Sequence, residues 1–417
     1  MTSPRMLEGY RVLDLSQFIA GPVCTSLLAE MGADVIKLEI APSGDRTRTF
    51  GLKPGAPEHR GSTHSSSYFQ HNHTKRSIAL DMKTTAAREL ALGMAAKVDV
   101  VVENFAPGVM ARLGLSYEDI QRVNPTVIMC SISLAGQTGP LSDRPGYDYI
   151  GQAYAGVTDL IGEPDRAPAM ANFAGGDVST GVAAAMGIGF ALLHRERTGE
   201  GQYLDASLVD TYFHMLEYHA PMIAMRGEGF QPTRQGSVNA DSPTMGIYPC
   251  GDGYVLLCAL PHQWQPLAKA LGMAGLEDDA RFATISARRK YKSELEGVLR
   301  GWFASFDTRD AAIAALEAER VPVAPVLSVS EAMRHPHLNA RNTVRWIDDP
   351  QLGRVAIPGV PVKFSSWPDR TELRSARLGE DNEAVLSELA GLSADDIADL
   401  YRSGVLVRDP TLAPQVA

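Results

Sequence analysis

The residues best suited to chemistry lie in the segment Phe173-Ala174-Gly175-Gly176-Asp177-Val178-Ser179-Thr180-Gly181. The paired glycines let the backbone approach a ligand closely, and Asp177 follows them at the predicted start of a long helix. The positive end of a helix favours an ionised carboxylate, which could act as a nucleophile through a covalent acyl intermediate. The adjoining amides could stabilise an oxyanion. The same position also suits a simple N-cap, with Asp177 bonded to the amides of Ser179 or Thr180.

Other polar segments could complete a binding site. Pro145-Gly146-Tyr147-Asp148-Tyr149 offers a second carboxylate, Asp148, which could orient the first or simply cap a helix. Glu103-Asn104-Phe105-Ala106-Pro107-Gly108, with Arg112 one turn later, offers an amide, an aromatic face and a cation for phosphate. Leu80-Asp81-Met82-Lys83 adds a second cation. The last two segments end predicted neighbouring strands, where open parallel sheets bind ligands.

Three other chemistries fit the sequence poorly. His64, His71 and His73 lack the acidic or further ligand spacing of a metal site, so we expect no metal. Ser131 and Ser133 lack a GxSxG elbow, which argues against a serine hydrolase. The first predicted strand is followed by SQFIAGP rather than GxGxxG, so a nicotinamide dinucleotide is poorly supported.

Alternating strands and helices are predicted to position these segments. The long helix is expected over about 179–197, after a loop region rich in glycine, proline and polar residues at 135–176. The repetition of strand, helix and strand predicts a parallel sheet covered by helices. Short apolar or β-branched runs indicate strands at 11–16, 34–39, 77–81, 98–105 and 126–134, with helices at 21–32, 84–97 and 116–124.

The middle of the chain predicts a second, smaller domain. A hairpin is expected over 248–260, turning at Gly251-Asp252-Gly253, and residues 225–245 suit a linker or an active-site loop. The tail is expected to form two amphipathic helices split at Gly391, the second capped by Ser393. Helices of the second domain are predicted at 263–272, 288–305 and 308–319.

Composition indicates a soluble, cytoplasmic protein. The 417 residues exceed one ordinary core, and 45% hydrophobic with 21% charged residues is typical of a globular chain. A net charge of −10 disfavours indiscriminate binding to nucleic acid or anionic membranes. The four cysteines form no CxxC pair, as expected of reduced thiols, and the start MTSPRMLEGY lacks a signal peptide's apolar stretch. The longest apolar run, Val182 to Leu193, is predicted to form a buried helix, since it is too short to span a bilayer.

Taken in order, these stretches resemble the class III coenzyme A transferases, the group that includes formyl-CoA transferase, and the related 2-methylacyl-CoA racemases. The resemblance extends over most of the chain and is therefore more specific than any one motif. It rests on VLDLSQFIAGPVCTSLLAEMGADVIKLE, GD (44–45), KRSIALDMK, VDVVVENFAPGVMARLG, GYD, GGDVSTG, HRERTGEGQ, VPVAPVLSVSEAM and LGEDNEAVLSEL.

The resemblance implies an α/β fold with a Rossmann-like large domain built from both ends of the chain. The expected boundaries are 1–215 for its first part, 230–325 for a smaller α+β domain, and 335–417 for the part that returns. An interlaced homodimer is also implied. The implied substrates are an acyl-CoA and a small carboxylic acid, with coenzyme A as substrate and no permanently bound cofactor.

Transferases and racemases differ in the residues that perform the chemistry. The transferases carry a nucleophilic Asp in G-D-x-x-T-G, which Gly176 and Asp177 match here. The racemases use a His in GHD and an Asp in DFxGG, where this chain has Tyr147 and Asn172. Tyrosine is a poor base near neutral pH and an amide cannot exchange a proton as a carboxylate does. We therefore expect transfer, with three rivals: a racemase or epimerase, a coenzyme A or nucleotide binding protein without activity, and a nicotinamide dehydrogenase.

The resemblance also assigns roles to single residues. Asp148 matches a position that holds an acidic residue in the transferases, and three departures from formyl-CoA transferase concern Ile19 in the first loop, Ile40 after the second strand, and SVNADSPT in place of a glycine-rich lid. These departures disfavour formate and oxalate as substrates. The catalytic residues expected are Asp177, Asp148 and Gly176. The coenzyme A site is expected to include Ile19, Ala20, Leu80, Lys83, Asn104, Phe105, Arg112 and Tyr147.

Overall fold

The computed structural model describes residues 4–49, 64–227, 229–239, 242–273, 275–370 and 372–412. The chain divides into two compact units. The larger unit contains Met1–Ala155, Asn172–Glu217 and Pro336–Ala417, and the smaller contains Gly156–Ala171 and Tyr218–His335.

Residues 156–171, which the sequence analysis placed in the first domain, group with the smaller unit. Two contacts account for this grouping. The Arg234 guanidinium pairs with the Asp159 carboxylate at 2.6 Å, and the Gly236 amide donates to the Gly162 carbonyl. Arg234 also donates to the Glu163 and Asp159 carbonyls, at 3.2 and 3.1 Å, so its guanidinium is tied to the 156–171 segment.

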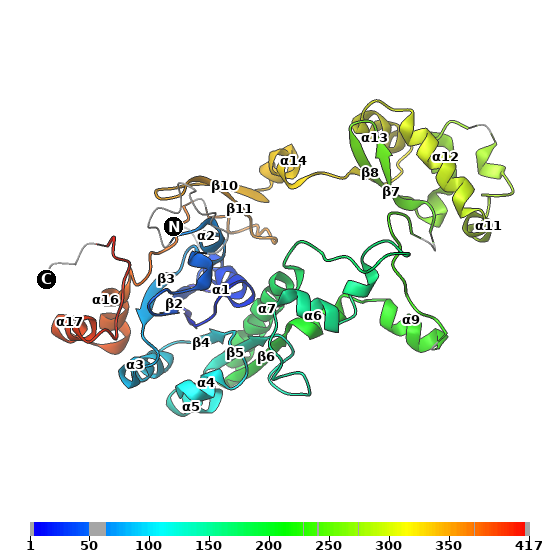
Figure 1. Ribbon diagram of the computed structural model, residues 1–417. Coiled ribbons are helices and arrows are strands. Elements are labelled where there is room, and N and C mark those ends of the chain that lie inside the picture. Colours follow the sequence, from blue (N-terminus) through cyan, green and yellow to red (C-terminus); the bar gives the residue numbers. More distant parts are fainter. Residues whose placement is uncertain are drawn as a thin grey trace. The chain divides into compact units, whose positions relative to one another are not determined.

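A parallel sheet forms the centre of the larger unit (Figure 1). Its six strands lie in the order β3-β2-β1-β4-β5-β6, and every neighbouring pair is parallel. The order reverses between β1 and β4, which is where open α/β sheets bind ligands. The predicted α/β class and parallel sheet are confirmed. The strands are β1 (Arg11–Asp14), β2 (Asp34–Ile40), β3 (Arg76–Leu80), β4 (Val100–Glu103), β5 (Ile128–Ser133) and β6 (Gln202–Ser207).

Helices cover both faces of this sheet. Side chains alternate between the two faces along each strand, so each face carries apolar residues that the helices bury. On one face, Val12 and Val35 pack against α1 (Ala20–Glu30) and α7 (Gly175–Thr198). On the other face, their sequence neighbours Leu13 and Ile36 belong to a second core cluster. That cluster includes α3 (Thr85–Ala95), α5 (Tyr117–Val123), α16 (Asn382–Val385) and α17 (Ala394–Arg402).

The end of the chain returns to the larger unit beside β3. The Ser77 and Ala79 amides donate to the side chains of Asp381 and Asn382, at 2.8 and 2.9 Å. The tail helices divide at Gly391 (φ 69°), and Ser393 caps α17 through a capping box, as predicted. The larger unit also contains α2 (Ser66–Asn72), α4 (Val109–Leu113), α6 (Asp148–Tyr154), α8 (Leu208–His214), α15 (Pro336–Ala340), β10 (Val344–Asp349) and β11 (Gly353–Pro358).

The smaller unit has its own core around an antiparallel sheet. The hairpin turns at Gly251 and Asp252 as predicted, while the single helix expected over 288–305 is two helices interrupted at Tyr291. In the predicted lid, Ala240 and Asp241 lie outside the described residues. The elements are α9 (His219–Arg226), β7 (Met245–Cys250), β8 (Gly253–Cys258), α10 (Trp264–Ala270), α11 (Ile285–Lys290), α12 (Lys292–Ala304), α13 (Arg309–Ala318), β9 (Val323–Pro325) and α14 (Val329–Arg334).

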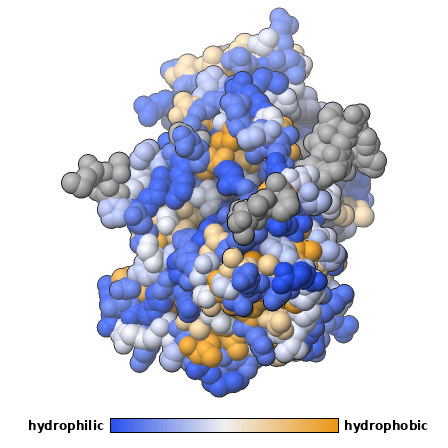
Figure 2. All heavy atoms as spheres, turned by 90° about the vertical axis from the view of Figure 1, so that its left-hand side faces the viewer, coloured by the Kyte–Doolittle hydropathy of each residue, from blue (hydrophilic) through white to orange (hydrophobic). Residues whose placement is uncertain are grey.

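Helix α7 is buried on one face only, which corrects the prediction of a buried helix. It is long and apolar enough, by length and composition alone, to cross a membrane. Ala184 and Ile188 pack on the sheet, whereas Val182, Met186 and Phe190 remain exposed at one-turn intervals. Elsewhere, the face of the larger unit shown in Figure 2 is mostly hydrophilic, with small separate hydrophobic patches.

Candidate active site

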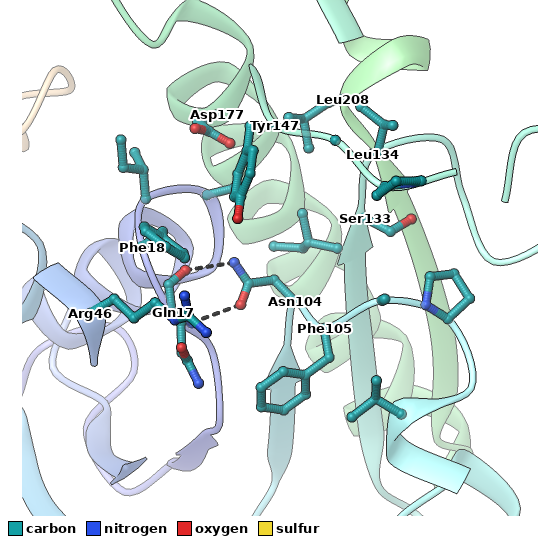
Figure 3. Close-up of a pocket in the computed structure, with 18 of the residues that line it drawn as sticks. Gln17, Phe18, Arg46, Asn104, Phe105, Ser133, Leu134, Tyr147, Asp177 and Leu208 are labelled. Carbon is teal, nitrogen blue, oxygen red and sulfur yellow. Dashed lines mark hydrogen bonds between the residues drawn. The ribbon is translucent and has the colours of Figure 1, made fainter. Parts of the chain in front are cut away.

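A cavity of about 700 Å³ lies in the larger unit beside the loops that follow β1, β4 and β5 (Figure 3). Its walls come from segments that are far apart in the sequence, which meet because parallel strands end at the same edge of a sheet. Seven of the residues predicted from the sequence line it together: Ile19, Ala20, Lys83, Asn104, Phe105, Tyr147 and Asp177.

Four predicted residues lie outside the cavity wall. Leu80 is fully buried in the sheet core, and Arg112 lies on α4 beside Gly108. Asp148 and Gly176 are buried next to Asp177. The structure therefore places Asp148 and Gly176 where they can support Asp177, while Leu80 lies behind the cavity wall and Arg112 is exposed on α4, whose Val109 and Leu113 line the cavity.

Asp177 lies in the first turn of α7 and is not its N-cap. The helix begins at Gly175, and its N-cap residue is Ala174, whose side chain cannot cap. Ser179 and Thr180 then fall in the interior of the helix, where backbone amides bond to carbonyls four residues earlier. No hydrogen bond joins the Asp177 carboxylate to another described residue, and this carboxylate lines the cavity. The capping interpretation is therefore wrong, and the carboxylate is available to a ligand.

Burial and a neighbouring charge both act on Asp177. Burial raises the pKa of its carboxyl, the negative charge of Asp148 raises it further, and together they bring it to about 7. Desolvation opposes the charged form, and a second carboxylate opposes it again. Near neutral pH, Asp177 is consequently present both as a carboxylic acid and as a reactive carboxylate.

Asp148 holds the backbone of Asp177. It is the first residue of α6, is 4% exposed, and accepts the Asp177 amide proton at 2.7 Å through Oδ2. Its other oxygen accepts the hydroxyl of Tyr212 at 2.5 Å. Asp148 thus supplies the cap that Ala174 cannot. Tyr212 was missed because nothing in the sequence near it signals a contact with position 148.

The loop after β1 forms one wall of the cavity and is held by Asn104. The Asn104 side chain accepts from the Gln17 amide and donates to the Gln17 carbonyl, both at 2.7 Å (Figure 3). The hydrogen bonds of Asn104 therefore position the loop, and its predicted contact with coenzyme A stays a prediction. Phe18 follows with φ 63°, and its ring meets Tyr147 edge-on at 5.7 Å between centroids.

A buried group of charges supports the same loop from below. Lys37 donates to the Ser16 carbonyl at 2.7 Å and pairs with Asp45 at 2.9 Å. Asp45 also accepts the Phe18 amide at 3.3 Å. Burial alone would raise the pKa of Asp14, but the charges of Lys37 and Lys75 outweigh it and lower that pKa well below its usual range. The unusual conformation at Phe18 is thus tied to ion pairs at the centre of the unit.

Cations give part of the cavity a positive character. Arg46, Lys83 and Arg144 line it, and none forms an ion pair with another described residue. In a chain of net charge −10, such a local cluster suits a phosphorylated ligand. Of the lining residues that the sequence analysis missed, Gln17 and Phe18 adjoin the predicted Ile19, and Arg46 follows Asp45 in the matching GD segment.

Ser133 also lines the cavity, at the end of β5. Its hydroxyl is buried and has no hydrogen-bond partner among the described residues. In the sequence, Ser133 stands out only as a candidate hydrolase nucleophile, and the missing GxSxG elbow disfavours that role. Its position instead offers a donor and acceptor to a bound ligand.

The histidines considered as metal ligands lie away from this cavity. Burial lowers the pKa of His71 to about 4 and that of His73 to about 3, so both are neutral at physiological pH. Within the ranges that the structure describes, no three His, Cys, Asp or Glu side chains gather closely enough to hold a metal ion.

The chain is similar in sequence to known proteins of one family. Residues 7–382 match the sequence model described as CoA-transferase family III. The chain is 33% identical over 405 residues to the succinyl-CoA–D-citramalate CoA-transferase of Chloroflexus aurantiacus, covering 97% of this chain and 98% of that protein. It is 37% identical over 387 residues to the succinate–glutarate CoA-transferase of Agrobacterium fabrum, covering 92% and 95%.

A solved structure shows the same fold. The crystal structure of a CaiB/BaiF family protein from Brucella suis aligns with a TM-score of 0.81 and 35% identity. The alignment covers 93% of this chain and 100% of that one.

Proposed function

The chain belongs to CoA-transferase family III, and from this premise we propose that it moves coenzyme A between carboxylic acids through covalent intermediates on Asp177. One observation carries the proposal. The Asp177 carboxylate lines a cavity with unpaired cations in its wall and accepts no hydrogen bond from another described residue. A carboxylate so placed can act as a nucleophile.

Four substitutions at carbonyl carbon complete the exchange. An Asp177 oxygen attacks the donor thioester, forming a mixed anhydride and releasing coenzyme A thiolate. The thiolate attacks the aspartyl carbonyl, which gives an aspartyl-CoA thioester and frees the donor acid. The acceptor carboxylate attacks that thioester, so that a second anhydride forms and the thiolate leaves again. Finally, the thiolate attacks the acceptor's carbonyl, which yields the new acyl-CoA and regenerates Asp177.

The cavity suits both coenzyme A and the anhydride intermediates of these four steps. The Arg46, Lys83 and Arg144 cations suit the phosphates of coenzyme A, and the Phe105 and Tyr147 rings offer apolar faces to the rest of that molecule. A thioester is exchanged for a thioester, so no external energy source is required. Half-buried surroundings around Asp177 would keep water from the anhydrides.

We further propose a succinyl-CoA donor and a dicarboxylic acceptor. The names of both relatives contain succinyl-CoA or succinate, and the other acids named, citramalate and glutarate, are dicarboxylates. The similarity extends over nearly all of each chain. The departures at Ile19 and Ile40 from formyl-CoA transferase favour acids other than formate and oxalate.

The test combines a substrate panel with detection of the covalent enzyme. Purified protein is mixed with succinyl-CoA or acetyl-CoA and with glutarate, malate, citramalate, oxalate or acetate, and new thioesters are identified by mass spectrometry. A parallel sample with succinyl-CoA alone is digested, and the peptide containing Asp177 is searched for a coenzyme A adduct. We expect a dicarboxyl-CoA product and an adduct at Asp177.

The Asp177→Asn variant is the control, because it keeps the shape of the side chain and removes the nucleophile. It should lose transfer by at least about four orders of magnitude, as expected when a covalent nucleophile is removed. Turnover near the wild-type rate, or an adduct on another residue, would reject Asp177. Deuterium incorporation at the α-carbon of a 2-methylacyl-CoA, without an acceptor acid, would indicate racemisation instead.

We also propose that two copies of the chain form the working enzyme. Val182, Met186 and Phe190 form an exposed apolar stripe along α7, each at least 40% exposed. Burying such a stripe against a second copy would remove apolar surface from water. The stripe belongs to the helix that carries Asp177, so assembly would also restrict the motion of that helix and of the nucleophile.

A further inference from the structure

Tyr212 connects three elements around Asp177 without reaching the cavity. It lies on α8, is 3% exposed, and is absent from the cavity wall. Its hydroxyl donates to Asp148 Oδ1 at 2.5 Å and is approached by Gln152 Nε2 at 3.5 Å. Asp148 and Gln152 both belong to α6, one turn apart. Tyr212 therefore fixes the carboxylate that in turn holds the Asp177 amide.

The Tyr212 ring also explains the glycine before Asp177. A Cβ at Gly176 would lie 2.1 Å from Tyr212 Cε2 and 2.7 Å from Cζ, distances that no side chain could accept without movement. The ring thus lies directly against the first turn of α7. Backbone and ring contact each other here, so the position of that turn depends on the tyrosine.

The hydroxyl of Tyr212 also governs the charge beside Asp177. Burial, followed by the hydrogen bond to Asp148, raises the pKa of Tyr212, so the hydroxyl remains a donor at all working pH values. The hydrogen bond that Tyr212 donates to Asp148 Oδ1 offsets part of the negative charge that acts on Asp177. Asp148 is the charged group that acts on Asp177, while α1 meets α7 farther along, at Gly181, through the Ala20 carbonyl and the Val23 side chain.

We propose that Tyr212 is a positioning residue for the nucleophile, acting through Asp148 and Gly176 to hold the first turn of α7 and to favour ionisation of Asp177. This inference rests on the proposed function, because it concerns how Asp177 is prepared for attack. It assigns Tyr212 no contact with substrate.

The test uses Tyr212→Phe, which keeps the ring against Gly176 and removes only the hydroxyl. The rate at which succinyl-CoA modifies Asp177 is measured in single turnovers between about pH 5.5 and 9, with binding of desulfo-coenzyme A measured separately. We expect modification about tenfold slower, since small displacements of a nucleophile have effects of this size or larger. The midpoint of its pH dependence should move upward by about half a unit or more, because the Asp148 charge is no longer shared. Binding of desulfo-coenzyme A should stay within about twofold, since Tyr212 lies outside the cavity.

Two further variants separate this role from general damage. Tyr154→Phe removes a hydroxyl from an exposed tyrosine on α6 and should change neither rate nor midpoint. Asp148→Asn removes the opposing charge, so its midpoint should move downward, opposite to that of Tyr212→Phe. Opposite shifts from two partners of one hydrogen bond are not expected of variants that merely loosen the fold.

The outcomes distinguish this inference from the proposed function. If wild-type protein carries no adduct at Asp177, the proposed function fails. If wild-type protein is modified there and Tyr212→Phe reacts at the same rate with the same or a lower midpoint, the role of Tyr212 is rejected. Equal losses of rate and of desulfo-coenzyme A binding would also reject it, because they would indicate a collapsed cavity.

Discussion

At the scale of single residues, Asp177 combines two requirements that oppose each other. A nucleophile must be ionised, yet water must be kept from the anhydrides that it forms. Burial and the charge of Asp148 raise the Asp177 pKa to about 7, so the protonated acid and the reactive carboxylate are both populated near neutral pH. The hydrogen bond from the Asp177 amide to Asp148 fixes the backbone while the carboxylate stays free.

The pH dependence of catalysis follows from this pKa. Attack requires the carboxylate, and the folded-state pKa of about 7 is raised, so kcat/KM should fall as pH decreases through about 7. Below that pH the decrease should approach tenfold per unit. Initial rates with succinyl-CoA and a dicarboxylic acceptor, from about pH 5.5 to 9, would measure it. A rate that stays level down to about pH 5.5 would contradict the assignment of this pKa to the attacking group.

At the scale of elements, the crossing of α1 and α7 decides where the nucleophile lies. Gly181 is the contact point: a Cβ there would lie 2.6 Å from the Ala20 carbonyl and 2.9 Å from Val23. Ala20 also lines the cavity, so a wider crossing would displace the loop after β1 together with α7. Gly181 in α7 thereby sets the position of two walls of the cavity, the loop after β1 and α7 itself.

Gly181→Ala should therefore destabilise the protein by about 1–3 kcal/mol, the usual cost of overpacking. Gly93→Ala on α3 is the matched control, since a Cβ there meets nothing within 4 Å. That change should instead stabilise by about 0.5–1 kcal/mol through helix propensity. Urea denaturation of both variants gives the comparison. A Gly181 variant as stable as the wild type would show that the crossing tolerates a wider spacing.

The loop after β1 depends on charges buried beneath it. Lys37 is the cation that Asp14 and Asp45 share, and all three side chains are fully buried. Removing one member of a buried ion pair leaves an uncompensated charge, which costs more than the pair itself contributes.

Lys37→Met should cost about 3–5 kcal/mol of unfolding free energy and raise the KM for acyl-CoA, because Ser16 and Phe18 lose their support. Lys97→Met, at an exposed lysine, should stay within about 0.5 kcal/mol of the wild type. Urea denaturation and initial-rate kinetics measure the two effects. A raised KM without loss of stability, or the reverse, would separate the loop from the ion pairs.

At the scale of the whole molecule, the exposed stripe on α7 is the surface on which the proposed dimer can be tested. Met186→Asp places a charge in the middle of the stripe and should convert the proposed dimer into a chain of 44.9 kDa in sedimentation velocity. Val123→Asp, at an exposed apolar residue on α5, should remain dimeric. A wild-type protein that sediments as a monomer and binds to lipid vesicles would overturn the dimer and assign the stripe to a membrane.

Local patterns in the sequence determined the elements and one decisive residue. Hydrophobic periodicity is a property of neighbouring residues, so β1 to β5 and the capped tail helix could be predicted, and Asp177 was identifiable from its glycines and its motif. Helix boundaries were less certain, and the start of α7 at Gly175 rather than 179 changed Asp177 from a cap to a free side chain.

Only the tertiary structure decided what surrounds that residue. Asn104 holds a loop through Gln17, and Tyr212 donates to Asp148 across 64 positions of sequence. Neither contact leaves a periodic or local signature, because each depends on where two separate elements meet in space. The raised pKa of Asp177 depends on burial and on a charge from another helix, so the carboxyl acquires it only once the chain has folded.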